Sequence, residues 1–321
     1  MVVPDQTAVW LFGGVLVVLG LATGAVHLLR RQGDIGLNRA VIEQFNLRLR
    51  TWWLLLAVLA AAFLFPRWVT VVLFGGLSFW ALREFITLTP TRPADHRALF
   101  WVFVVITPAQ YVCVGLDIYG LYSVLIPVYG FLFIPARVAV AGDAKRYLER
   151  CAKIQAGLMI CVYCLSHAPA VLSLRLSNYP PEKNPMLLFF LVLLIAMGDV
   201  FLYAAEKLIG QRPIAPAISA TKTWEGALGG LVCATLFGTA LCTILGLADA
   251  TPFAPLQAAC MSAIVTTMAY AGGLTMSAIK RDRGVKDYGT LIEGHSGVLD
   301  RIDSLCFAAP IFFHFTRYFF R

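Results

Sequence analysis

The sequence predicts an all-α protein, a polytopic integral membrane bundle of about ten transmembrane helices. Hydrophobic residues make up 59% of the 321 residues and charged residues only 14%, against about 25% charged residues in soluble domains. Most apolar residues fall in runs close to the roughly 20 residues that a spanning helix needs. Basic residues gather in every second loop between these runs. These three observations exclude an ordinary soluble domain.

The apolar runs define the expected spans in chain order. They lie near residues 8–29, 51–66, 68–89, 99–116, 118–137, 154–174, 186–206, 225–247, 254–276 and 302–320. The second run is short and the next three are crowded, so smaller counts of eight or nine spans stay open. The first run lacks the basic residues of a signal peptide, and we therefore expect it to be retained as a span.

The distribution of lysine and arginine predicts the orientation of the bundle. Of the 26 basic residues, 21 lie in the odd-numbered loops, and loops rich in basic residues face the cytoplasm. Both chain ends would then lie outside. The net charge of +8 is expected to meet anionic lipid and not nucleic acid. We expect an integral protein of the bacterial inner membrane, with its charged segments on the cytoplasmic side.

Residues that carry chemistry are concentrated in the second part of the chain. We expect residues 1–185 to form a transmembrane scaffold and residues 186–321 to form the catalytic region. The first polar cluster follows the apolar run MLLFFLVLLIAMG, where Asp199, Tyr203 and Glu206 share one helix face. A carboxylate near the centre of a span costs roughly 2.5–3.5 kcal/mol, so this face predicts a metal or nucleotide cavity. A solvated helix end is the alternative.

Residues 210–226 predict a phosphate-binding turn. Gly210 is expected to end the seventh helix. Ser219 and Thr223 can each cap the helix that follows, and a helix start offers free N–H groups to an anion. Lys222 adds a positive charge at this point. The alternative is a capped helix with a lysine that reaches the headgroup region.

The segment 277–303 holds five basic residues, five acidic residues and one histidine between two apolar runs. Its basic side chains are candidates for binding phosphate. For Lys280 and Arg281 the alternative is that they anchor the helix at the lipid headgroups. Together with Ser277, the candidates are Lys280, Arg281, Lys286 and Arg301.

The same segment predicts a divalent-cation site. Asp300 and Asp303 are three residues apart and face the same way on a helix. Two carboxylates this close repel unless a cation lies between them, and Mg²⁺ binds carboxylate and phosphate oxygens. His295 is a candidate general acid or base, or a donor to a developing phosphate charge; a loop histidine that bonds local carbonyls is the alternative.

These residues resemble the signature of the phosphatidate cytidylyltransferases, also called CDP-diacylglycerol synthases. The matching pattern is Ser277-x-x-Lys280-Arg281-x4-Lys286-Asp287-x7-His295-x-Gly297-x-x-Asp300-Arg301-x-Asp303. The segment Asp199…Ser219-x-x-Lys222-Thr223-Trp224-Glu225-Gly226 is similar to a second motif of the family, and the resemblance covers roughly residues 190–310. The sequence departs from the family at Ser296, where a glycine is usual, and at Thr221, where a lysine is usual.

The resemblance implies a reaction in which CTP and phosphatidic acid give CDP-diacylglycerol and pyrophosphate. The lipid phosphate would attack the α-phosphorus of CTP, and catalysis would consist of positioning and charge neutralisation. Mg²⁺, with a second, monovalent cation left open, would bind catalytic carboxylates, and the basic side chains would hold phosphates. The resemblance implies the carboxylates Asp287, Asp300 and Asp303, helped by Asp199. A homodimer is also implied.

Three alternatives stay open. A CTP-dependent polyprenol or lipid-alcohol kinase would use a similar site but release CDP. An ion-coupled transporter would use Asp199 in the membrane, but it predicts paired repeats and broken helices, which the sequence does not display. A catalytically impaired homologue would fit the departures at Ser296 and Thr221.

Overall fold

The computed structural model describes residues 67–89, 91–243, 251–285, 287–288 and 297–321, with scattered positions before residue 67. The chain divides into two compact units, Met1–Pro66 and Arg67–Arg321. In the first unit the described positions are mostly helical, and Trp53 Nε1 donates a hydrogen bond to Thr23 Oγ1 (3.1 Å). The predicted spans at 8–29 and 51–66 otherwise lie outside the described residues, and the second unit is described below.

In the part of the chain that the structure describes, seven helical stretches are long and apolar enough to cross a membrane. They are Arg67–Leu88, Pro93–Gly115, Tyr119–Ala139, Tyr147–Ser173, Pro181–Leu208, Trp224–Thr243 and Pro255–Asp282. Each coincides with one predicted run between residues 68 and 276, so the all-α membrane class is confirmed. The run predicted at 302–320 forms helix α13 (Leu299–Phe319), which lies outside this set because Asp303, His314 and Arg317 make it less apolar.

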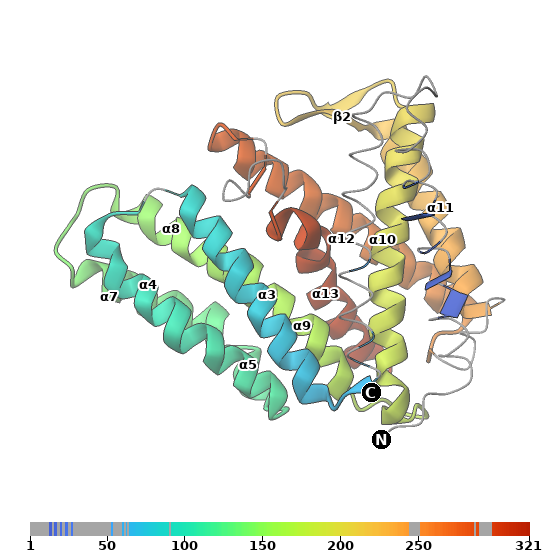
Figure 1. Ribbon diagram of the computed structural model, residues 1–321, viewed down its shortest axis with the longest axis horizontal. Coiled ribbons are helices and arrows are strands. Elements are labelled where there is room, and N and C mark those ends of the chain that lie inside the picture. Colours follow the sequence, from blue (N-terminus) through green and yellow to red (C-terminus); the bar gives the residue numbers. More distant parts are fainter. Residues whose placement is uncertain are drawn as a thin grey trace. The chain divides into compact units, whose positions relative to one another are not determined.

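The first four stretches form one group of helices, labelled as in Figure 1. Its elements are α3 (Arg67–Leu88), η1 (Pro93–Asp95), α4 (His96–Phe100), η2 (Trp101–Ile106), α5 (Thr107–Gly115), α6 (Tyr119–Tyr122), η3 (Leu125–Gly130), α7 (Phe131–Ala139), α8 (Tyr147–Leu158), η4 (Met159–Cys164), α9 (Leu165–Ala170) and η5 (Val171–Ser173). Helix α3 packs against α5, α8 and α9. It buries Phe74, Leu82 and Phe85 at this contact surface, which makes α3 the centre of the group.

Three of these spans contain a π-helical turn, namely η2, η3 and η4. A proline lies within or shortly after each turn, at Pro108, Pro127 and Pro169. Proline has no N–H, and its ring clashes with the carbonyl four residues back. For Pro108 that carbonyl belongs to Val104 inside η2, and the wider turn there accommodates the ring while the span stays continuous. Thr107 illustrates the change, because its Oγ1 donates to the carbonyl of Val102, five residues back (2.8 Å).

The remaining elements form a second group, at the right of Figure 1. They are η6 (Pro181–Lys183), α10 (Asn184–Leu208), β1 (Pro213–Ala215), β2 (Ser219–Thr223), α11 (Trp224–Thr243), α12 (Pro255–Asp282) and α13 (Leu299–Phe319). Helices α10, α11 and α12 pack on one another. Helix α13 packs against α12 and also against α3 and α9, so it lies at the seam between the two groups.

Four of the loops predicted to face the cytoplasm meet at one end of this unit. Loops are numbered by the predicted span that they follow, so the third loop follows 68–89 and the fifth follows 118–137. An ion pair between Arg150 and Asp95 (2.8 Å) joins these two loops. Arg281 Nε donates to the carbonyl of Ile218 (3.3 Å), which joins the seventh and ninth loops. Glu84, in the last turn of α3, accepts hydrogen bonds from the first turn of α13 and joins the third loop to the ninth. The alternation of basic residues therefore corresponds to a real separation of the loops.

The opposite end of the unit gathers the even-numbered connections. Arg67 Nη2 donates to the carbonyl of Gly115 (2.6 Å). The Ser177 N–H donates to the carbonyl of Phe320, just beyond α13 (2.8 Å). The spans thus run between two ends that differ in charge, as a membrane bundle requires.

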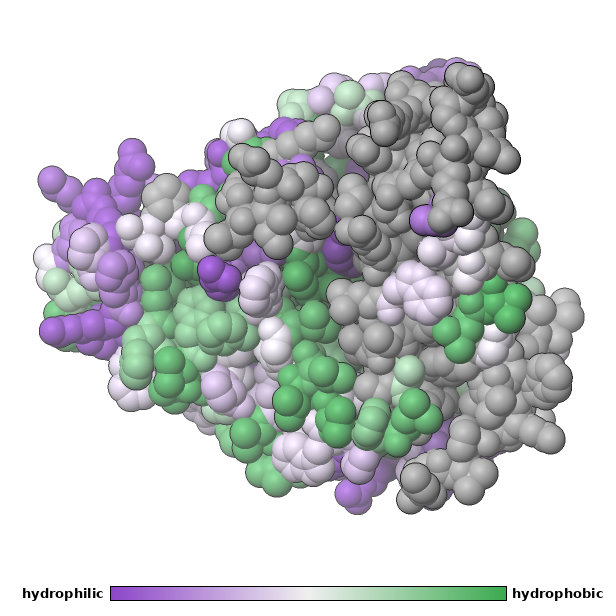
Figure 2. Space-filling model, viewed as in Figure 1, coloured by the Kyte–Doolittle hydropathy of each residue, from purple (hydrophilic) through white to green (hydrophobic). Residues whose placement is uncertain are grey.

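Apolar side chains cover much of the surface between the two ends. On α11, Leu228, Val232 and Leu236 are 61%, 58% and 65% exposed. Their spacing of four residues places them on one helix face. Figure 2 shows hydrophobic residues over the middle and lower part of the visible face, and hydrophilic residues toward its left end. This surface has the chemistry that lipid chains accept.

Candidate active site

Close packing of α10 against α11 sets the geometry of the site. A Cβ added at Gly226 would lie 2.4 Å from the Glu206 Cγ, and one added at Gly230 would lie 2.5 Å from the Leu202 Cα. Only glycine permits this approach at either position, as in other close contacts between membrane helices. The strand β2 that leads into α11 is thereby held beside the polar end of α10.

A short antiparallel hairpin precedes α11, within the segment 210–226 for which the sequence predicted a phosphate-binding turn. Strands β1 and β2 pair with Pro213 opposite Thr223 and Ala215 opposite Ser219. The Thr223 Oγ1 accepts a hydrogen bond from the Gly226 N–H (3.2 Å), so the predicted cap is present. A capping role for Ser219 is wrong, because Ser219 lies in β2.

Glu225 in the first turn of α11 holds the base of the hairpin. Its Oε2 accepts hydrogen bonds from the backbone N–H groups of Gln211 and Arg212, just before β1 (3.1 and 3.0 Å). Within β2, the Ser219 hydroxyl bonds the Thr221 hydroxyl (3.2 Å). The hairpin is therefore fixed at its base by the start of α11, and Lys222 is carried on its second strand.

Lys222 lies within electrostatic range of carboxylates of α10 and α13. Its Nζ lies 4.6 Å from the ring centre of Tyr270, a cation–π contact. The Tyr270 hydroxyl donates to Glu206 Oε1 (3.3 Å). Burial lowers the pKa of Lys222. The charges of Asp303, Glu206 and Asp199 act in the opposite direction and favour its ammonium form.

Asp199 and Asp303 are connected through one serine. The Ser304 Oγ lies 3.2 Å from both carboxylate oxygens of Asp199 and donates to them. The Ser304 backbone N–H donates to Asp303 Oδ1 (2.8 Å). Asp199 is exposed at the polar end of α10, and Asp303 is partly buried in α13. The structure thus brings together two carboxylates that are 104 positions apart in the printed sequence.

Asp300 makes a different set of contacts. Its Oδ1 accepts from Lys280 Nζ (2.7 Å), and its Oδ2 accepts from the backbone N–H groups of Tyr288 (2.8 Å) and Gly297 (3.1 Å). The Lys280 and Asp300 side chains are 16% and 8% exposed. Both oxygens of Asp300 are therefore engaged by protein donors. The pairing with Lys280 was not predicted, and a metal ion at Asp300 would have to displace or share these donors.

The remaining predicted site residues have the following contacts and positions. Ser277 Oγ donates to the carbonyl of Gly273 (2.6 Å), within its own helix. Arg281 bonds the carbonyls of Ile218 and Val285. Asp287 is exposed and directly precedes Tyr288, and Arg301 is partly buried in the first turn of α13. Lys286 and His295 lie outside the described residues.

One residue near the site was missed by the sequence reasoning. Glu84, in the predicted scaffold, bonds the first two N–H groups of α13. The only sequence signal was a carboxylate inside an apolar run, Thr70 to Leu88, of the kind that marked Asp199.

The donor atoms present fit a magnesium ion that binds together with a triphosphate. Among the described residues, no three His, Cys, Asp or Glu side chains converge into a ready-made metal cluster. Mg²⁺ commonly uses one or two carboxylates, with substrate phosphates and water as the remaining ligands. Asp199 and Asp303, linked by Ser304, offer such a pair of hard oxygen donors.

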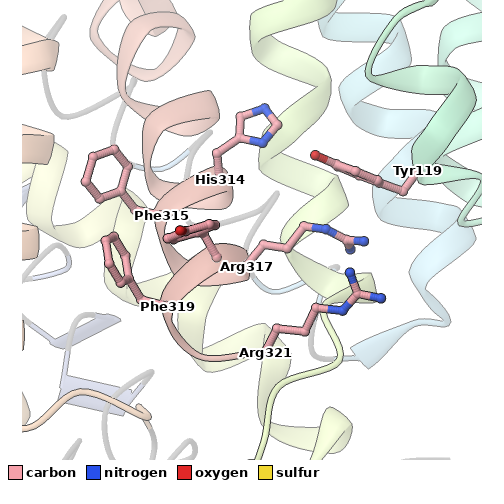
Figure 3. Close-up of a pocket in the computed structure, with 7 residues that line it drawn as sticks. Tyr119, His314, Phe315, Arg317, Phe319 and Arg321 are labelled. Carbon is pink, nitrogen blue, oxygen red and sulfur yellow. The ribbon is translucent and has the colours of Figure 1, made fainter.

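A cavity of about 570 Å³ lies at the other end of α13. It is lined by Tyr119, His314, Phe315, Arg317, Tyr318, Phe319 and Arg321. The Arg317 guanidinium lies 3.7 Å from the ring centre of Tyr119, and Figure 3 shows Arg317 and Arg321 extending to the same side. His314, the cavity residue of α13 nearest Asp300 in the sequence, follows it by 14 residues of helix, or roughly 21 Å, so the cavity is not part of the charged cluster.

Known proteins resemble this chain over most of its length. A sequence model of the cytidylyltransferase family matches residues 46–319. The uncharacterized protein YnbB of Escherichia coli K12 is 36% identical over 275 residues, which cover 86% of this chain and 88% of that protein.

Two relatives carry the name phosphatidate cytidylyltransferase. That of Haemophilus influenzae is 40% identical over 157 residues, covering 47% of this chain and 52% of that protein. That of Pseudomonas aeruginosa is 36% identical over 144 residues, covering 45% of this chain and 52% of that protein. The chain therefore matches about half the length of each of these two enzymes.

Proposed function

Because the chain belongs to the cytidylyltransferase family, it is an integral membrane nucleotidyltransferase, and we propose that it transfers the cytidylyl group of CTP to phosphatidic acid. The products would be CDP-diacylglycerol and pyrophosphate. The observation that carries the proposal is the convergence of Lys222, Asp199 and Asp303 from β2, α10 and α13. Such a cluster matches the needs of a reaction between two anions.

The bound substrates are neutralised by charges that the fold holds in place. Lys222 binds phosphate oxygens, and its ammonium lies over the Tyr270 ring, whose hydroxyl bonds Glu206. At the start of α11 the Trp224 and Gly226 N–H groups are already bonded to the Arg212 carbonyl and the Thr223 hydroxyl, so Lys222 is the phosphate-binding donor at this turn. Fixed donors of this kind stabilise the charge that develops in the transition state, because they need not reorganise.

Asp199 and Asp303 would hold Mg²⁺, and Ser304 orients both carboxylates. When bound there, the ion would supply charge neutralisation for the triphosphate and for the pyrophosphate product. Asp300 organises the start of α13 and holds Lys280, and it enters the metal shell only if one of its donors is released. Asp287 and His295 keep the catalytic roles predicted for them, together with phosphate binding by Ser219, Ser277, Arg281, Lys286 and Arg301.

The site is proposed to face the cytoplasm, where CTP is available. The four loops that meet at this end include most of the basic residues of the described unit. The lipid would approach from the side, at headgroup level, since α11 presents an apolar face to the bilayer. The bacterial inner membrane and a homodimer belong to the same proposal. Mass photometry of the purified protein tests the dimer.

The decisive experiment uses CTP labelled in the cytidine ring, phosphatidic acid vesicles and Mg²⁺. We expect the label in the lipid extract, with one pyrophosphate released per lipid formed. Label that appears as free CDP, with phosphorylation of an added polyprenol, would instead indicate the lipid-alcohol kinase. A folded protein that binds CTP but forms neither product would be the impaired homologue. Asp303→Asn serves as the inactive control.

A further inference from the structure

The last turn of α3 reaches the start of α13. Glu84 Oε1 accepts a hydrogen bond from the Val298 N–H (3.0 Å), and Oε2 accepts one from the Leu299 N–H (2.8 Å). Trp80 Nε1, one turn earlier on α3, also donates to Oε1 (3.1 Å). Glu84 is only 6% exposed. Three protein donors, and not bulk water, therefore satisfy its carboxylate.

This arrangement answers a general need of helix ends. The first N–H groups of a helix have no partner within the helix, and the helix dipole favours an anion there. Glu84 supplies that anion from 214 residues away in the sequence. Asp300 completes the cap by accepting a hydrogen bond from the Gly297 N–H. Three successive N–H groups, 297–299, thus bond carboxylate oxygens.

We propose that Glu84 is a positioning residue for the nucleotidyl-transfer site, an inference that rests on the function proposed above. Asp303 and Ser304 follow Leu299 by four and five residues, little more than one helical turn. The contact of Ser304 with Asp199 on α10, and with it the place of Asp303 beside Asp199, depends on where α13 begins and how it is rotated. Glu84 fixes both, because its two oxygens bond two successive N–H groups. It touches neither reactant and acts through α13.

A merely structural role for Glu84 predicts a less stable protein whose folded fraction has normal kinetics. The variant Glu84→Gln separates the two roles, since an amide keeps the shape but can accept from only one of the two N–H groups. The matched control is Thr89→Val, which removes a buried hydroxyl just after the same helix, where it bonds only the carbonyls of Phe85 and Ile86.

The test measures kinetics, CTP binding and hydrogen exchange on purified protein in detergent. In Glu84→Gln we expect kcat to fall about tenfold or more, because small misplacements of catalytic groups have large effects on rate. We also expect a higher Mg²⁺ concentration for half-maximal activity and faster exchange in a peptide spanning 297–303. Thr89→Val should match the wild type in all three, and Glu84→Asp should recover part of kcat.

The inference is overturned by normal exchange at 297–303 in Glu84→Gln, or by faster exchange with unchanged kcat and Mg²⁺ dependence. A wild-type protein that forms no CDP-lipid would instead refute the proposed function. In that case hydrogen exchange at 297–303 and the affinity for CTP with Mg²⁺ can still be measured in Glu84→Gln and in the wild type. These two measurements test the role of Glu84 without the reaction, so failure of the Glu84 proposal is distinguished from failure of the proposed function. If Glu84→Gln does not fold, Glu84→Asp carries the same measurements.

Discussion

The substitution Asp300→Asn should destabilise the protein, whereas Asp303→Asn should leave it folded. Asp300 forms an ion pair with Lys280 at 2.7 Å, and the two side chains are 8% and 16% exposed. Removal of one partner from a buried ion pair costs about 3–5 kcal/mol, because the other charge is left without compensation. We expect the lower end, about 3 kcal/mol, because the asparagine carbonyl still accepts a backbone N–H bond.

This loss is large enough for a thermal melt. For a unit of this size, 1 kcal/mol corresponds to roughly 2–4 °C in Tm, so Asp300→Asn should melt about 6–12 °C below the wild type. The assay is intrinsic fluorescence during heating of purified protein in detergent. The double variant Lys280→Met/Asp300→Asn should recover part of the loss, because it removes the stranded charge as well.

The reasoning is refuted if Asp300→Asn melts with the wild type, or if Lys280→Met/Asp300→Asn melts below the single variant. The first result would mean that Asp300 is not held as the contacts indicate. It would favour the sequence-based prediction in which Asp300 and Asp303 are equivalent metal ligands. Addition of Mg²⁺ and CTP gives a second comparison: it should raise Tm in Asp300→Asn but not in Asp303→Asn.

Three further substitutions test the rest of the site and the fold. Asp303→Asn should abolish product formation with an unchanged melt, and activity near that of the wild type would remove Asp303 from the metal site. Lys222→Met should raise the apparent KM for CTP or lipid about tenfold or more through loss of a charge-assisted contact; an unchanged substrate curve would leave Lys222 as a headgroup anchor. Asp95→Asn should lower stability by about 3–5 kcal/mol, because Arg150 and Asp95 are 4% and 1% exposed, and a melt equal to that of the wild type would contradict this.

The sequence was sufficient for those features that depend on local patterns. The predicted run 68–89 corresponds to α3, Arg67–Leu88, and the run 254–276 overlaps α12, Pro255–Asp282, in all but its first residue. Lipid requires that spans be continuous and apolar, so periodicity and length were strong signals. The cap at Thr223 was equally local, since it depends on residues three positions apart.

Features that depend on contacts between distant segments could not be read in this way. Asp300 looked like half of a metal-binding pair because its helical spacing to Asp303 was visible, whereas its bond to Lys280 crosses 20 residues. Glu84 was counted as scaffold because its partners lie at 298 and 299. The hairpin before α11 was missed for another reason: its strands of three and five residues are too short for a period-two pattern.

The buried pair of Arg150 and Asp95 has a consequence for how the chain enters the bilayer. Its members lie 55 residues apart, with the spans Pro93–Gly115 and Tyr119–Ala139 between them. The two charges lie on the same side of the membrane only if both crossings are made or neither is. If just one of the crossings fails, Arg150 and Asp95 remain on opposite sides of the membrane, and each is left unneutralised against apolar helices. The ion pair can therefore form only when an even number of membrane crossings separates Asp95 from Arg150, so it favours the correctly inserted topology.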